Sequence, residues 1–199
     1  MTLPNQITIG RILLIPVFVL LAIYYGQSVA SGHPDERLRF ATIAVFLTAA
    51  LSDGIDGWIA RRYRLKSPLG AILDPIADKG LMLTAIITLS VTSWPYELPI
   101  WFPVLVIARD VMIVTGVGVI RLLNDRVEIR PSLLGKTSTF LQMFTVAVVM
   151  LQWRHCDPVV WATGAVTLVS GIAYLAAGVR LLQDGGHTRP VAMDRTEHS

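Results

Sequence analysis

Four aspartates with helical spacing are the residues best suited to chemistry in this 199-residue chain. Asp53 and Asp56 are three positions apart, and Asp74 and Asp78 are four positions apart. On an α-helix, either spacing places both side chains on one face. If the two faces meet, four carboxylates converge, and their oxygens are the ligands that hard divalent cations prefer. Two such ions, about 3.5–4 Å apart, are the usual catalytic arrangement for displacement at phosphorus.

The elements that carry these acids are strongly apolar. The chain is 53% hydrophobic and 16% charged, whereas soluble domains contain about 25% charged residues. A helix that spans a bilayer needs about 20 mostly apolar residues. Six segments meet this requirement: Ile7–Tyr25, Phe40–Arg61, Gly70–Thr92, Leu98–Leu122, Gly135–Trp153 and Val159–Leu182. The sequence therefore predicts an all-α integral membrane protein with six transmembrane helices in one domain, residues 1–182. The polar, glycine-containing residues 183–199 are predicted to form a disordered tail.

Basic residues predict how these segments are oriented. They are concentrated in the second loop, in the fourth loop and in the tail: Arg61, Arg62, Arg64, Lys66, Arg121, Arg126, Arg130, Lys136, Arg189 and Arg195. The third loop has no Lys or Arg, and the fifth has only Arg154. Because cytoplasmic loops are enriched in Lys and Arg, we expect the even loops and both termini to be cytoplasmic. The same dispersal argues against nucleic-acid binding, although the net charge is +3.

The four acids are then expected at one depth, near the cytoplasmic face. An ionised carboxylate near the middle of a membrane costs about 2.5–3.5 kcal/mol, and four together repel one another. Bound cations would neutralise them. Small residues, Gly57, Ala60 and Gly70, lie on the same helical faces and leave room for a bulky polar ligand. Arg61 ends this face, where a cation could hold a diphosphate.

Other functions account for the acids less well. Intramembrane acids also serve ion or proton-coupled transporters, which need a path to both sides of the membrane. Here the acids share one depth, and no inverted repeat is apparent. A structural zinc site is disfavoured because the only cysteine, Cys156, does not cluster with the four histidines.

These residues resemble the signature of the CDP-alcohol phosphotransferase family. The signature reads here as Asp53-Gly-Ile-Asp56-Gly57-Trp-Ile-Ala60-Arg61, then eight residues, then Gly70-Ala-Ile-Leu-Asp74-Pro-Ile-Ala-Asp78. All eight fixed positions are filled, and the resemblance covers nearly the whole chain. It implies a six-span fold with cytoplasmic termini, a homodimer and an active site that faces the cytoplasm, here of a bacterial inner membrane.

The resemblance also implies roles for single residues. Asp53, Asp56, Asp74 and Asp78 look like ligands of two divalent ions, Mg²⁺ or Mn²⁺, and Asp78 looks like the general base. The CDP group would be framed by Asn5, Thr8, Gly57, Ala60, Arg61 and Gly70. Asn5 and Thr8 belong to a short Asn-x-x-Thr-x-x-Arg element that ends at Arg11. The reaction implied is transfer of a phosphatidyl group from CDP-diacylglycerol to an alcohol, with release of CMP.

The acceptor is indicated by basic residues outside the signature. The segments around Arg109-Asp110 and Gly135-Lys136 look like phosphatidylglycerophosphate synthases and CMP-forming cardiolipin synthases. Arg109 and Lys136 are candidates to clamp an acceptor phosphate, although a structural salt bridge would also explain Arg109, and an interfacial anchor Lys136. Ser138 stands where many such synthases have a second basic residue. Glycerol 3-phosphate is the favoured acceptor, and phosphatidylglycerol is the alternative.

Overall fold

The computed structural model describes residues 3–63, 68–123 and 133–185, and it describes side chains within 6–52, 77–119 and 133–179. Six α-helices occupy these ranges: α1 Leu3–Ala30, α2 Glu36–Tyr63, α3 Pro68–Val91, α4 Trp101–Leu123, α5 Leu133–Met150 and α6 Cys156–Gly185. Each predicted apolar segment overlaps one of these helices. The all-α prediction is therefore confirmed for the described chain.

Four helices are long and apolar enough to cross a membrane. The qualifying ranges are Gln6–Ala30, Trp101–Val119, Leu133–Met150 and Cys156–Val179. Within the described residues, α2 and α3, which carry the acidic signature, are not among them. The chain thus has the helices of a membrane protein, whereas six spans and cytoplasmic termini stay predictions. The predicted start of the tail falls within α6, and residues 186–199 lie outside the described part.

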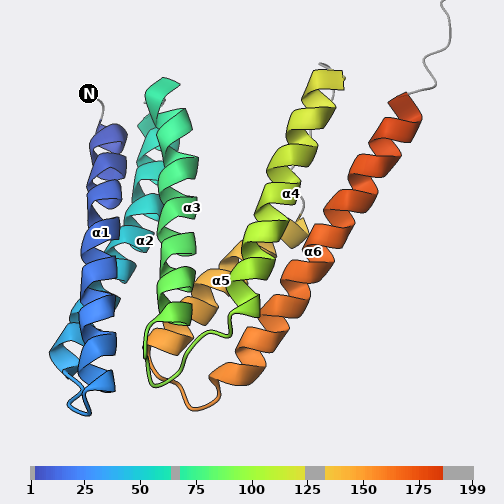
Figure 1. Cartoon of the computed structure of the whole chain (residues 1–199). Coiled ribbons are helices and arrows are strands. Elements are labelled where there is room, and N and C mark those ends of the chain that lie inside the picture. Colours follow the sequence, from blue (N-terminus) through green and yellow to red (C-terminus); the bar gives the residue numbers. More distant parts are fainter. Residues whose placement is uncertain (1–2, 64–67, 124–132, 186–199) are drawn as a thin grey trace, which may run out of the picture.

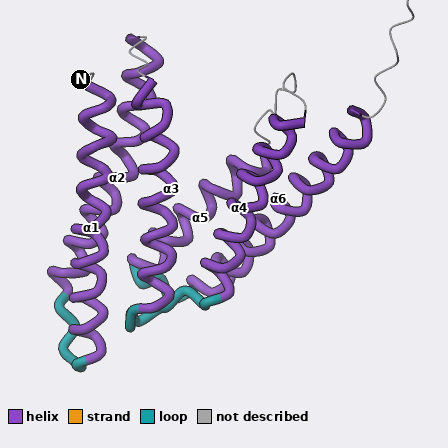
Figure 2. Tube along the Cα trace, turned by 45° about the horizontal axis from the view of Figure 1, so that its top comes forward, coloured by secondary structure: helices purple, strands orange, loops and turns teal. Residues whose placement is uncertain are grey.

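The helices form two groups that splay apart (Figures 1 and 2). α1 packs against α2 and α3, and α6 packs against α4 and α5. α5 also contacts α2 and α3, and α3 contacts α4; in Figure 1, α5 crosses behind α4 between the two groups. The starts of α1 and α3 and the ends of α2, α4 and α6 lie at one end of the molecule, at the top of Figure 1. The connections α1–α2, α3–α4 and α5–α6 lie at the other end.

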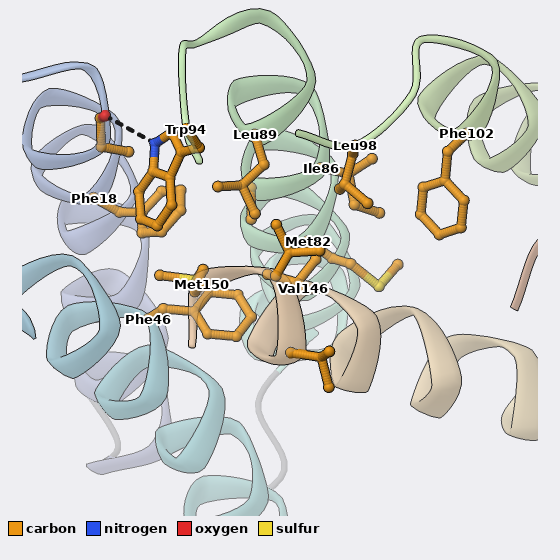
Figure 3. Close-up of a cluster of buried hydrophobic side chains, with 14 of the residues drawn as sticks. Phe18, Phe46, Met82, Ile86, Leu89, Trp94, Leu98, Phe102, Val146 and Met150 are labelled. Atoms are coloured by element: carbon orange, nitrogen blue, oxygen red, sulfur yellow. Dashed lines mark hydrogen bonds between the residues drawn. The ribbon is translucent and has the colours of Figure 1, made fainter. Parts of the chain in front are cut away.

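Both groups share an apolar core near the end that carries these three connections (Figure 3). Phe18 of α1 packs against Phe46 of α2, with 5.9 Å between the ring centroids. The indole nitrogen of Trp94 donates a hydrogen bond of 3.2 Å to the carbonyl oxygen of Ala22, which ties the α3–α4 connection to α1. Large apolar side chains also cover the outside, as lipid contact requires: Leu13, Leu51, Val104, Val114, Phe140, Trp161 and Ile172 are exposed.

A close contact between α4 and α6 yields the first prediction. A Cβ atom at Gly164 would lie 2.7 Å from the Cη2 and Cζ3 atoms of Trp101. The Trp101 ring has little freedom to move, because its centroid is 4.8 Å from that of Trp161 and 5.7 Å from that of Phe102. We expect Gly164→Ala to lower the free energy of unfolding by about 1–3 kcal/mol through overpacking, measured as a lower Tm in detergent.

Gly118→Ala on α4 is the matched control, because nothing lies within 4 Å of its added Cβ. Its Tm should not fall. An equal loss in both variants would mean that helix flexibility, not the Trp101 contact, requires glycine.

Candidate active site

The backbone brings the four signature acids to one level of a helix hairpin. Asp53 and Asp56 lie in the last three turns of α2, and Asp74 and Asp78 lie in the first three turns of α3. At about 1.5 Å per residue, each pair is roughly 9–15 Å from the hairpin end of its helix. α2 and α3 contact each other, as both pairs must to share ligands. The side chains of Asp53, Asp56 and Asp74 lie outside the described set, so their convergence stays a prediction.

The remaining signature positions are described only as backbone. Gly57, Ala60 and Arg61 continue along α2, and Gly70 lies in the first turn of α3. Asn5 lies in the first turn of α1. The roles of these residues around a CDP group therefore also stay predictions.

Asp78 is the signature acid whose side chain is described. It is partly buried, and it follows the buried Ala77. Gly80, two residues later, is turned toward α1, because an added Cβ would lie 3.4 Å from the Cδ1 atom of Ile15. Asp78 is thus held on a packed helix while part of its surface stays accessible, as a group that exchanges protons with a substrate requires.

The N-terminal element is turned toward the helices that carry the acids. Thr8 is fully buried, and Arg11, one turn later, is 1% exposed. Because α1 packs against α2 and α3, the buried face with Thr8 and Arg11 is the face turned to those helices. A cationic side chain is rarely buried so completely unless it meets polar or charged groups.

Arg109 belongs to a buried ionic cluster. Its guanidinium donates from Nη1 to the Oδ1 atom of Asp110 at 2.8 Å, and from Nη2 to the hydroxyl of Ser170 at 3.2 Å. Nη2 also lies 3.5 Å from the carbonyl oxygen of Gly135. The other oxygen of Asp110 forms an ion pair with the ammonium of Lys79 on α3. Arg109 therefore forms the salt bridge that the sequence left as an alternative to a phosphate-binding role.

Lys136 lies beside this cluster but differs from Arg109 in burial. It is exposed, and it directly follows Gly135, whose carbonyl oxygen faces the Arg109 guanidinium. The start of α5 thus brings the two candidate acceptor-binding cations to the same part of the bundle. Asp110 lies in one of the sequence segments that suggested the acceptor, and Lys79 directly follows the signature, but no role was predicted for either.

Side-chain hydroxyls join α5 to α6 between the Arg109 cluster and the α5–α6 connection. The Ser138 and Thr167 hydroxyls are 3.1 Å apart, and the amide nitrogen of Gln142 donates to Thr167 at 3.1 Å. One turn further, the Thr145 and Thr163 hydroxyls are 2.7 Å apart. Such contacts substitute for the absent hydrophobic driving force between membrane helices. Ser138 is fully buried, so the position that is basic in many synthases here carries a packing contact.

The donor set fits divalent cations by its chemistry. Within the described side chains there is no group of three or more His, Cys, Asp or Glu residues that could hold a metal. Three of the four signature carboxylates lie outside that set. The four positions supply only carboxylate oxygens, from two helices in contact, and this ligand type matches Mg²⁺ or Mn²⁺ better than zinc or copper.

Together, the fold and site define an all-helical protein whose described part has four helices long and apolar enough to cross a membrane. A helix hairpin carries the acids, and a buried ionic cluster lies beside it. The family model for CDP-alcohol phosphatidyltransferase matches residues 1–175. The chain belongs to this family, as its signature indicated.

Curated relatives align along most of the chain. A probable phosphatidylglycerophosphate synthase of Mycobacterium tuberculosis H37Rv is 37% identical over 196 residues, which cover 96% of this chain and 86% of the relative. The CDP-diacylglycerol–glycerol-3-phosphate 3-phosphatidyltransferase of Rickettsia bellii is 34% identical, covering 88% of this chain and 94% of the relative. The Escherichia coli K12 protein of the same name is also 34% identical, covering 88% and 93%.

Proposed function

We propose that this chain is an enzyme of phospholipid biosynthesis that transfers a phosphatidyl group from CDP-diacylglycerol to glycerol 3-phosphate. The products are phosphatidylglycerophosphate and CMP. The observation that carries the proposal is the complete acidic signature at one level of two contacting helices, α2 and α3. The names of the relatives, at 32–37% identity over most of the chain, favour glycerol 3-phosphate as the acceptor.

The chemistry follows from the signature residues. Asp78 accepts the proton of the acceptor hydroxyl, whose oxygen attacks the phosphorus on the lipid side of the diphosphate. The new phosphorus–oxygen bond forms as the bond to the CMP oxygen breaks, and the electron pair leaves with CMP. This in-line displacement needs no covalent enzyme intermediate. A base must lie within about 2.6–3.2 Å of the proton, or one water away, and the partial exposure of Asp78 is compatible with this.

The other site residues bind and orient. Two divalent ions, which supply charge neutralisation at the diphosphate when bound, would be held by Asp53, Asp56, Asp74 and Asp78. The CDP group would be framed by Asn5, Thr8, Gly57, Ala60, Arg61 and Gly70. Arg109 and Lys136 would attract the acceptor phosphate, with Arg109 held in place by its buried contacts.

The membrane arrangement is part of the proposal. All six helices span the membrane, and the active site faces the cytoplasm of a bacterial inner membrane. The helix ends that adjoin both termini lie at one end of the bundle, which supports placing both termini on one side. The basic residues of the second and fourth loops favour the cytoplasmic side. A homodimer is proposed from the family resemblance.

An acceptor screen tests the proposed function. Detergent-purified protein with CDP-diacylglycerol and Mg²⁺ or Mn²⁺ should release CMP when glycerol 3-phosphate is added. We expect background release with phosphatidylglycerol, inositol phosphate, serine or no acceptor, because the cationic clamp must hold the phosphate of the acceptor while the glycerol hydroxyl reaches the base. CMP is measured by chromatography, and the lipid product by mass spectrometry.

Release with phosphatidylglycerol alone would replace the acceptor assignment and make the chain a CMP-forming cardiolipin synthase. If none of the acceptors gave CMP, from protein that stays folded and monodisperse, the donor assignment would be overturned.

A further inference from the structure

One carboxylate holds two cations from different helices. The Oδ1 atom of Asp110 accepts from Arg109 at 2.8 Å, and its Oδ2 atom pairs with the Lys79 ammonium. Asp110 is 7% exposed and Arg109 is 4% exposed, whereas the side chain of Lys79 is 42% exposed. The cluster therefore has a rigid, buried half on α4 and a more accessible half on α3.

The cluster links elements that otherwise diverge. Lys79 directly follows Asp78 on α3, and Arg109 also reaches Ser170 of α6 and Gly135 at the start of α5. The two helix groups splay apart toward the end where α1 begins (Figure 1). The ion pair between Lys79 and Asp110 crosses from one group to the other. It thus connects the helix that carries the proposed base to the helices that carry the proposed acceptor clamp.

Electrostatics makes Asp110 the member that the cluster depends on. Two cations and one anion leave a net charge of +1, which favours an anionic ligand nearby. Without the carboxylate, the two cations would repel each other, and the buried guanidinium would lose its charged partner. Lys79 has a long, flexible side chain, so its ammonium would then take other directions.

We infer that Asp110 is a positioning residue for the acceptor: it fixes Lys79 and Arg109 relative to Asp78, so that an anionic acceptor meets these cations while its hydroxyl meets the base. This inference rests on the proposed function. It adds Lys79 to the acceptor-binding cations and predicts that Asp110 acts on acceptor affinity, through its two partners, rather than on the donor.

Kinetics of the full-length protein in detergent tests this role. For Asp110→Asn we expect the KM for glycerol 3-phosphate to rise about tenfold, as for loss of an interaction made equally in ground and transition states. The KM for CDP-diacylglycerol should change by less than about twofold. Asp110→Glu keeps the charge and should restore most of the acceptor affinity.

Thr145→Val is the matched control. It removes a buried polar contact with Thr163, 2.7 Å long, between α5 and α6, but it touches none of the cluster. If Asp110 only stabilised the bundle, both variants would lower Tm and neither would raise the acceptor KM. That result would overturn the inference.

A second readout does not depend on activity. The chain has three lysines, Lys66, Lys79 and Lys136, and Lys136 is exposed. A membrane-permeant amine-reactive ester, followed by peptide mass spectrometry, gives the labelling of Lys79 relative to Lys136. We expect this ratio to rise several-fold in Asp110→Asn, because the ammonium loses its partner.

The two readouts separate the possible failures. An unchanged labelling ratio would overturn the ion pair, and with it the inference, even in an active enzyme. If the wild-type protein converts none of the acceptors, the proposed function and the positioning role both fall, and a raised ratio would then assign Asp110 to structure alone.

Discussion

Replacing Asp78 with Asn is expected to reduce CMP release by three orders of magnitude or more, within about the range reported for loss of a general base. Asn has nearly the same shape as Asp, but it cannot accept the proton of the acceptor hydroxyl. It also removes one of four negative charges from the proposed metal site. Because Asp78 is only partly buried, the variant should fold and keep its Tm. The measurement is CMP release from CDP-diacylglycerol and glycerol 3-phosphate at saturating substrate.

Glu97→Gln is the matched control for this variant. Glu97 is an exposed carboxylate in the α3–α4 connection, at the end of the bundle opposite the start of α1 (Figure 1). The same neutralisation at this position should leave the rate unchanged. If Asp78→Asn retained a rate within about tenfold of the wild type, Asp78 could not be the base, and another group would have to accept the proton.

Hydropathy predicted the helices well because apolar length and helical structure coincide in a membrane protein. It did not predict where the helices end. α1 begins at Leu3 and continues to Ala30, beyond the predicted Ile7–Tyr25. Polar residues extend the helix at both ends, and hydropathy does not detect helical turns made of polar residues. α6 likewise continues to Gly185, past the predicted end at Leu182. The splay of the two groups depends on packing between side chains distant in sequence, which a periodic pattern does not encode.

The positions of the candidate site residues on their helices were predictable where the signal is local. The acids have helical spacing within single helices, and Thr8 and Arg11 are one turn apart on a face that proved to be buried. The partner of Arg109 was predictable only as some acid. Asp110 serves as that partner and also pairs with Lys79, 31 positions earlier, and no local pattern connects α3 to α4. The hydroxyl contacts of α5 and α6 were missed because Ser and Thr scarcely alter the hydropathy of an apolar segment.

Removal of divalent metal is expected to abolish turnover completely and reversibly. Four carboxylates on two contacting helices repel one another unless cations lie between them, and the diphosphate adds further negative charge. Chelation with EDTA followed by gel filtration should leave protein that releases no CMP above background. Adding back Mg²⁺ or Mn²⁺ should restore the full rate. Full activity in the chelated, metal-free protein would contradict the two-metal proposal.

Stability gives an independent test of the same site, without substrate. A ligand that binds only the folded state at 100 times its Kd adds about 2.7 kcal/mol to the free energy of unfolding, so Mg²⁺ should raise the Tm of the chelated wild type. Asp56→Asn should show a much smaller rise. Its apo form should be as stable as the wild-type apo form or more so, because one repulsive charge is gone.

Asp157→Asn is the control, because Asp157 is an exposed acid in the first turn of α6. This variant should respond to Mg²⁺ as the wild type does. An equal rise in all three proteins would assign the effect to the ionic strength of the solution and leave the carboxylates without their proposed ligand role.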